Sequence, residues 1–365
     1  MKYILVSILS IFLALTSANA QVRVVDALDN IPVSAASAFD AQGNVVGYTL
    51  SNGVLSDIPV SAYPLTLRCM GYEQLVIDTP EEKIWQMVPI LFDLPELVVV
   101  PQDRNVLKQT FYAREYFSIT TTSDTINFFT EHMTGRLVPA SKDAKFKGDS
   151  DMRIYGSRAY ANYKLGGEDS TVVKSEMMFP SMLHLLQECD EEITVPESFK
   201  ADDNQVKIYE EQGKSGVSLI YKQNAYSFTT VEDMMAKKKK HSASLWPLKI
   251  FGLTMRVNQL YATHSYIPND EGIYLPKDLQ EASLVIEADV KGLLIRKMIG
   301  SDQPMVVRSM VEIYLVDWDY LTQKEADEEC DNEKRTDNFI IPSSVPPLNE
   351  ATRRLVEKAI AGANP

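Results

Sequence analysis

The sequence predicts a mainly β, α+β fold: an N-terminal seven-stranded antiparallel β-sandwich followed by an α+β domain with a large antiparallel sheet. Two observations lead to this fold class. Residues 21–101 consist of short β-type segments separated by turn residues at regular spacing. Residues 151–329 consist mainly of longer segments rich in β-branched and aromatic residues, with few stretches of helical periodicity.

Residues 1–20 are expected to be a secretory signal peptide. They contain Lys2, an apolar run from Tyr3 to Leu15 and an Ala-x-Ala ending, which is typical of cleavage before Gln21. The alternative is an uncleaved membrane anchor, although the apolar run is shorter than the ~20 residues that span a bilayer. No Cys follows the cleavage site, so no lipoprotein anchor is indicated.

Turn residues divide residues 21–101 into short strands. Asn and Gly at these turns tolerate positive φ angles, which tight turns between strands require. The expected strand segments are 22–26, 28–40, 45–50, 54–60, 65–73, 84–92 and 94–100.

The segment "LTLRCMGY" illustrates the strand pattern. Alternation places Leu67 and Cys69 on one face, where Cys69 is expected to be a buried core thiol, and Arg68 on the other. Gly71 would allow a bulge or a sharp bend. The ring of Tyr72 would pack while its hydroxyl finds a polar partner.

The order of these strands and turns resembles the carboxypeptidase regulatory-like domain, a transthyretin-like sandwich of exported proteins in Bacteroidetes-type envelopes. The resemblance covers residues 22–100, and the chain departs from the family pattern at Leu50 and Leu55, where Asp and an aromatic residue are usual. It implies an accessory, non-catalytic domain in the periplasm or at the outer membrane. The matching residues are Pro32, Val33, Gly43, Thr49, Asn52, Gly53, Gly71 and Tyr72.

Residues 102–150 are expected to form a helical connector. In their second half, Ile126, Phe129 and Met133 would fall on one helical face, and Gly135 would end the helix. The pattern in the first half is mixed.

Residues 151–329 are expected to form the α+β domain, with a short amphipathic helix at 179–189. The strand order also resembles the half-barrel of lipoprotein carriers, in which a curved sheet wraps an apolar helix, although no motif supports that resemblance. The expected strands lie within 152–165, 170–175, 205–231, 248–267, 282–300 and 305–321.

Residues 330–365 are expected to form a polar, Pro-rich linker and a C-terminal helix. The linker, 332–348, is expected to be loose. The closing helix has Leu355, Ala359 and Ile360 available for docking.

The acidity of the chain limits its partners. The formal net charge is −14 at pH 7, and loss of Lys2 with the signal peptide would make it −15. Nucleic acid is excluded as a general partner because phosphate contacts need clustered Lys and Arg. The one basic cluster could contact anionic lipid head groups, or could be an exposed loop between strands. It consists of Lys237, Lys238, Lys239 and Lys240.

No catalytic constellation, cofactor site or metal site is recognisable. His132, His184, His241 and His264 lack the paired spacing of a zinc site, and we expect His132 and His184 to lie in helices as packed or exposed imidazoles. The sequence contains no Gly-x-Ser-x-Gly elbow and no Gly-rich phosphate-binding loop.

Asp317 and Asp319 are candidate carboxylates. They flank Trp318 and would project from one strand face, which suits a carbohydrate-active enzyme. The alternative is a solvated strand end.

Cys189 and Cys330 are a candidate disulfide. Both lie in acidic surroundings, and an oxidising compartment would permit a bridge between them. The alternative is two free thiols.

Together these observations favour an exported, non-enzymatic cell-envelope protein that acts by binding or scaffolding. The first alternative is a periplasmic lipid or lipoprotein carrier with a curved sheet. The second is a carbohydrate-active enzyme that uses Asp317 or Asp319. The expected partner is an envelope protein or a lipid, with peripheral membrane contact left open.

Overall fold

The described part of the chain is mostly β-strand, which confirms the mainly β, α+β class. No helix in that part is long and apolar enough to cross a membrane. The computed structural model describes residues 22–55, 58–90, 103–122, 124–146, 151–165, 171–174, 182–183, 192–197, 199, 207–224, 226–236, 253–292, 305–331 and 339–363.

The N-terminal part is a sandwich of seven strands in two sheets, as predicted. One sheet has the order β4-β1-β7 and the other β3-β2-β5-β6. The sandwich differs from an all-antiparallel one because β1 pairs with β7 in parallel. Its elements are β1 (Val22–Asp26), β2 (Ser37–Phe39), β3 (Val45–Tyr48), β4 (Val54–Leu55), η1 (Val60–Ala62), β5 (Leu65–Arg68), β6 (Leu75–Ile77) and β7 (Ile84–Met87).

The predicted alternation builds the core of the sandwich. Leu67 is buried between the two sheets. Cys69, predicted to be a buried core thiol, packs against the same cluster but is only partly buried. Gly71 adopts φ +76°, so it makes the predicted bend. The Tyr72 hydroxyl donates to Asp26 Oδ2 over 3.0 Å, which is the polar partner that the sequence required.

The second part is a ten-stranded antiparallel sheet, hereafter the large sheet, with the order β11-β10-β9-β8-β19-β18-β16-β15-β14-β13. A separate two-stranded sheet pairs β12 (Ile193–Thr194) with β17 (Ile273–Tyr274), and η3 (Pro276–Asp278) follows. The strands of the large sheet are β8 (Val106–Thr120), β9 (Thr125–Pro139), β10 (Arg153–Lys164), β11 (Thr171–Lys174), β13 (Lys207–Gln212), β14 (Val217–Gln223), β15 (Phe228–Asp233), β16 (Leu253–Tyr266), β18 (Leu279–Gly292) and β19 (Met305–Leu321).

The prediction of a helical connector at 102–150 is wrong. This region contributes β8 and β9, two long central strands, so the large sheet begins well before residue 151. Both strands are buried on both faces, so apolar residues occur on both. Ile126 and Phe129, assigned to one helical face, therefore belong to clusters on opposite faces of the sheet.

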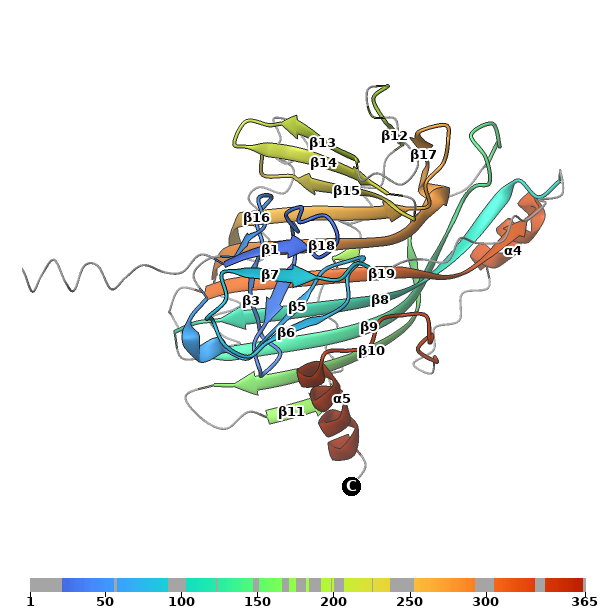
Figure 1. The fold of residues 1–365 in the computed structure, drawn as a ribbon. Helices are drawn as coiled ribbons and strands as arrows, with labels where there is room; N and C mark the ends of the chain where they lie inside the picture. The colour runs from blue at the N-terminus through green and yellow to red at the C-terminus, as the bar shows by residue number, and fades with distance from the viewer. Residues whose placement is uncertain are drawn as a thin grey trace, which may run out of the picture.

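A different cluster of buried residues lies on each face of the large sheet. Neighbouring side chains point to opposite faces, so Val285 and Met310 pack toward the sandwich while Leu284 and Val311 belong to a cluster on the far side. Figure 1 shows the sandwich, in blue, lying across β18, β19 and β8, and the C-terminal helix beside β10 and β11.

The C-terminal region contains α4 (Gln323–Asp331) and α5 (Glu350–Ala363). The amide of Thr352 donates to Asn349 Oδ1, which caps α5. Leu355 and Ala359 are buried as predicted, but Ile360 is exposed, because only one face of the helix meets the sheet.

The linker is not loose in its described part, residues 339–349. The carbonyls of Pro346 and Pro347 accept hydrogen bonds from the buried guanidinium groups of Arg114 and Arg68. These bonds hold the segment against the sheet and the sandwich. The predicted helix at 179–189 falls outside the described residues apart from Met182 and Leu183.

Candidate functional site

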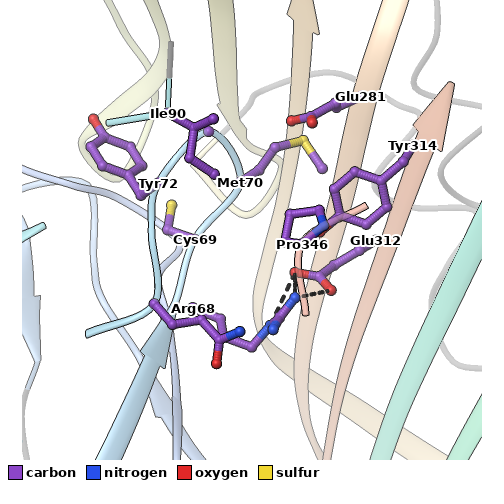
Figure 2. A pocket seen from close by; sticks show the side chains of 11 residues that line it. Arg68, Cys69, Met70, Tyr72, Ile90, Glu281, Glu312, Tyr314 and Pro346 are labelled. Atoms are coloured by element: carbon purple, nitrogen blue, oxygen red, sulfur yellow. Dashed lines mark hydrogen bonds and ion pairs between the residues drawn. The ribbon is translucent and has the colours of Figure 1, made fainter. Parts of the chain in front are cut away.

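A small cavity lies where the sandwich meets the large sheet, a contact hereafter named the seam. Figure 2 shows the cavity between the end of β5, with the bend that follows it, and strands β18 and β19. The space inside it holds about one water molecule. It is lined by Arg68, Cys69, Met70, Gly71, Tyr72, Gln74, Ile90, Glu281, Glu312, Tyr314 and Pro346.

A buried ion pair joins the two sides of the seam. Arg68 Nη2 donates to Glu312 Oε2 over 2.8 Å and Arg68 Nη1 donates to the Pro347 carbonyl over 3.0 Å, as Figure 2 shows for the first pair. The two side chains are 3% and 2% exposed, so solvent does not screen the pair. Burial alone would lower the pKa of Arg68, but Glu312 raises it above its ordinary value.

Glu281 is the unusual carboxyl of the seam. It is 7% exposed, and its Oε2 atom is buried without a hydrogen-bond partner in the described part of the chain. Burial, together with the charge of Glu312, raises the pKa of Glu281 to about 8. Glu281 is therefore mostly protonated at neutral pH. Burial and Glu312 also raise the pKa of the Cys69 thiol to about 12, so this cysteine is not a reactive thiolate.

Apolar and polar contacts extend the seam along the sheet. The ring of Phe39 meets that of Tyr116 edge-on, with 5.2 Å between ring centroids. The Tyr48 hydroxyl lies 3.0 Å from the Ser309 carbonyl oxygen and 3.1 Å from that of Ile286, so it reaches between β18 and β19. The sandwich is thus fixed to the sheet by packing as well as by charge.

A second charged contact joins the sandwich to the large sheet beside Tyr72, which also lines the cavity. Lys222 on β14 lies 2.6 Å from Asp26 Oδ2 and 3.3 Å from Asp29 Oδ2. Burial would raise the pKa of Asp26, but its bonds with Lys222, the Leu28 amide and Tyr72 lower it on balance. Asp26 is therefore ionised and paired.

A polar cluster lies on the same sheet face beneath residues 339–349. The Tyr112 hydroxyl donates to Glu131, and Arg114 Nε donates to the Tyr112 hydroxyl over 3.4 Å. Arg158 lies 3.4 Å from Glu131 and stacks over the Phe339 ring at 4.1 Å. Because these groups bond to one another, we interpret the cluster as part of the packing of the fold and not as a binding site.

The far face of the large sheet is apolar over most of its strands. Its buried cluster includes Phe128 on β9, Leu284 on β18 and Phe228 on β15, and Leu183 packs onto it. His132, predicted to lie in a helix, is on a strand, where its Nε2 lies 3.0 Å from Glu115.

The predicted carboxylate pair, Asp317 and Asp319, lies at the exposed end of β19 beside Trp318. The Asp317 side chain accepts a hydrogen bond from the neighbouring Trp318 amide, and Asp319 lies 3.8 Å from Arg104. Neither lines the seam cavity. The structure therefore gives this pair no enclosed site.

Other predicted site residues stay untested. Lys237, Lys238, Lys239, Lys240 and Cys189 fall outside the described residues, as do His184 and His241. The backbone of Cys330 lies in α4, but its side chain is not described. The predicted disulfide and the predicted lipid-contacting lysines remain predictions.

Sequence reasoning missed the roles of Arg68, Glu281 and Glu312 in the seam, although it noted that Arg68 faces away from Leu67. One signal was available for Glu312, which interrupts the run "VEIYLV", where a charge in an otherwise apolar strand predicts a buried partner. The identity of that partner was not predictable, since Arg68 and Glu312 are 244 residues apart.

Comparison with known proteins gives no family. No protein-family model matches the chain, and no curated protein matches it. Among solved structures, one titled as lipid-protein interactions in lipovitellin is similar at 9% identity and a TM-score of 0.27. The similarity covers 60% of this chain and spans 26% of the lipovitellin chain. A TM-score this low supports no inference about function.

Proposed function

We propose that this protein is an exported, non-enzymatic binding or scaffolding protein of the cell envelope, in which the sandwich is an accessory unit fixed to the large sheet. The observation that carries the proposal is the seam. Its buried Arg68–Glu312 pair, its aromatic contacts and the Lys222 contact join the two parts into one rigid surface. A rigid unit suits a protein that presents a surface to a partner.

Further observations support parts of this proposal. The two-sheet, seven-stranded arrangement agrees with the carboxypeptidase regulatory-like resemblance, which implies export. The exposed position of Asp317 and Asp319 weighs against a glycosidase that uses this pair, since such a pair needs a site that holds a sugar.

A second candidate function is a carrier of lipids or lipoproteins. The observation that favours it is the far face of the large sheet, where apolar side chains of β8, β9, β15, β16, β18 and β19 form one cluster. These side chains are 9% exposed or less, so an acyl chain could contact them only if part of the protein moves off this face. Two ionisable groups there, His132 and Glu115, already contact each other within the protein.

One preparation tests both functions. The mature protein is purified from a fractionated envelope without detergent, and its organic extract is analysed by mass spectrometry. Lipid at one or more molecules per protein would identify the carrier function. Protein free of lipid, with one envelope protein recovered by cross-linking in intact cells, would identify the scaffold. Absence of both lipid and a cross-linked partner would contradict the proposal.

A further inference from the structure

The seam contains a buried carboxyl group, that of Glu281, which forms no ion pair with the described residues. Glu281 lies on β18 opposite Tyr314, and Glu312 lies two positions along β19. Its buried Oε2 atom lacks a hydrogen-bond partner among the described residues, while the cavity beside it holds about one water. A buried charge without a partner is strongly unfavourable, so the geometry favours a neutral carboxyl.

Ionisable groups from both sides of the seam line the cavity together with Glu281. The sandwich contributes Arg68, Cys69 and Tyr72, and β19 contributes Glu312 and Tyr314. On β16 the opposite residue is Ser265, which is not ionisable. These positions are visible in Figure 2, apart from Ser265.

Two buried cations of the seam, Arg68 and Arg114 on β8 opposite Glu312, are already committed. Arg114 donates to the Tyr112 hydroxyl and to the Pro346 carbonyl. Arg68 Nε and Nη2 donate to Glu312, and Nη1 donates to the Pro347 carbonyl. The Arg68–Glu312 pair is neutral as a unit. Ionisation of Glu281 would therefore create a buried charge beside Glu312 whose Oε2 atom has no hydrogen-bond partner among the described residues.

We propose that the seam is a proton-linked latch: a proton on Glu281 keeps the sandwich closed on the large sheet, and loss of that proton loosens the contact. The pKa of about 8 given by burial and by Glu312 supports this role. Because the folded-state pKa is raised above the ordinary 4.5, the stabilisation is complete below about 4.5. It declines as the pH rises and is lost as the pH passes through about 8.

Hydrogen exchange measured by mass spectrometry tests the latch. Protection factors of residues 65–77 are compared at pH 7 and pH 9, after correction for intrinsic exchange. In the wild type they should fall about tenfold, because one group with a pKa of about 8 ionises across this interval. Residues 125–139 of β9, outside the cavity lining, serve as the internal reference and should change little.

Variants separate Glu281 from other titrating groups. Glu281→Gln and Glu281→Met cannot ionise and should show no fall in protection at residues 65–77. Glu287→Gln is the matched control, since Glu287 lies on the same face of β18 and is paired with Arg308 at 2.7 Å, and it should behave as the wild type does. Unchanged wild-type protection at pH 9, or an equal fall in both Glu281 variants, would overturn the latch.

Discussion

Arg68 shows how one side chain at the end of a short strand joins two parts of the molecule. Removing a guanidinium group from water costs several kcal/mol, and only a well-placed carboxylate with additional acceptors offsets that cost. Glu312 and the Pro347 carbonyl provide those acceptors. The net stability from such a pair is small, but the loss of one partner is costly.

Arg68→Met should destabilise the protein by about 3–5 kcal/mol, because Glu312 would remain buried without a counter-charge. The double variant Arg68→Met/Glu312→Leu should recover most of this loss. The free energy of unfolding in guanidinium chloride measures both. Arg353→Gln on α5, where the ion pairs are exposed, is the control and should have little effect. A small loss for the single variant would show that Glu312 finds another partner or a proton.

Among single elements, turns and helix faces show how a residue's effect on stability depends on its surroundings. Gly53 and Gly71 both adopt positive φ angles, of +75° and +76°, but their surroundings differ. A Cβ atom at Gly53 would lie 2.5 Å from the Val24 carbonyl oxygen, whereas nothing lies within 4 Å of one at Gly71. Substitutions at these two glycines therefore allow the cost of backbone strain to be measured separately from the cost of close packing.

Gly71→Ala should cost about 1 kcal/mol, from the left-handed backbone alone. Gly53→Ala should cost about 2 kcal/mol or more, since the new methyl group must also displace strand β1. Chemical denaturation of the two variants side by side gives the difference. Equal costs would mean that the turn at Gly53 relaxes away from Val24.

Helix α5 docks through one narrow face. Leu355→Ala should destabilise the protein by about 2–3 kcal/mol, because Leu355 is buried between the sandwich and the large sheet. Ile360→Ala, five residues along the helix and 48% exposed, should change stability by no more than about 0.5 kcal/mol. Thermal unfolding followed by circular dichroism measures both. Similar losses for the two variants would contradict the docking face.

At the scale of the whole molecule, the seam determines whether the two parts unfold together. The contacts across it include buried ion pairs, aromatic packing and the carbonyls of the C-terminal segment. Contacts of this kind couple folding units, so a single cooperative transition is expected.

Trp85 provides a reporter for this coupling, because it is buried in the core of the sandwich. In a Trp246→Phe/Trp318→Phe background, Trp85 fluorescence and the far-ultraviolet circular dichroism should show the same denaturation midpoint. Adding Arg68→Met and Lys222→Met should shift the fluorescence midpoint to lower denaturant than the dichroism midpoint. Separate midpoints before these substitutions would show that the two parts are not coupled.

The outcome for individual residues shows where sequence reasoning ends. The alternation around Leu67, the bend at Gly71 and the need of Tyr72 for a partner were predictable, because each depends on a few neighbouring residues. The helix predicted around Ile126, Phe129 and Met133 was wrong. In a strand buried on both faces, apolar residues at i and i+3 occur without a helix.

Local sequence was enough to predict the fold class, the seven-stranded sandwich and the closing helix, since turn chemistry, capping and period-two alternation act locally. Only the tertiary structure decided that residues 106–139 are central strands and that Arg68, Glu281 and Glu312 meet in one cavity. The physical reason is burial. The protonation of Glu281 and the partner of Arg68 depend on which distant residues exclude water around them, and local sequence does not contain that information.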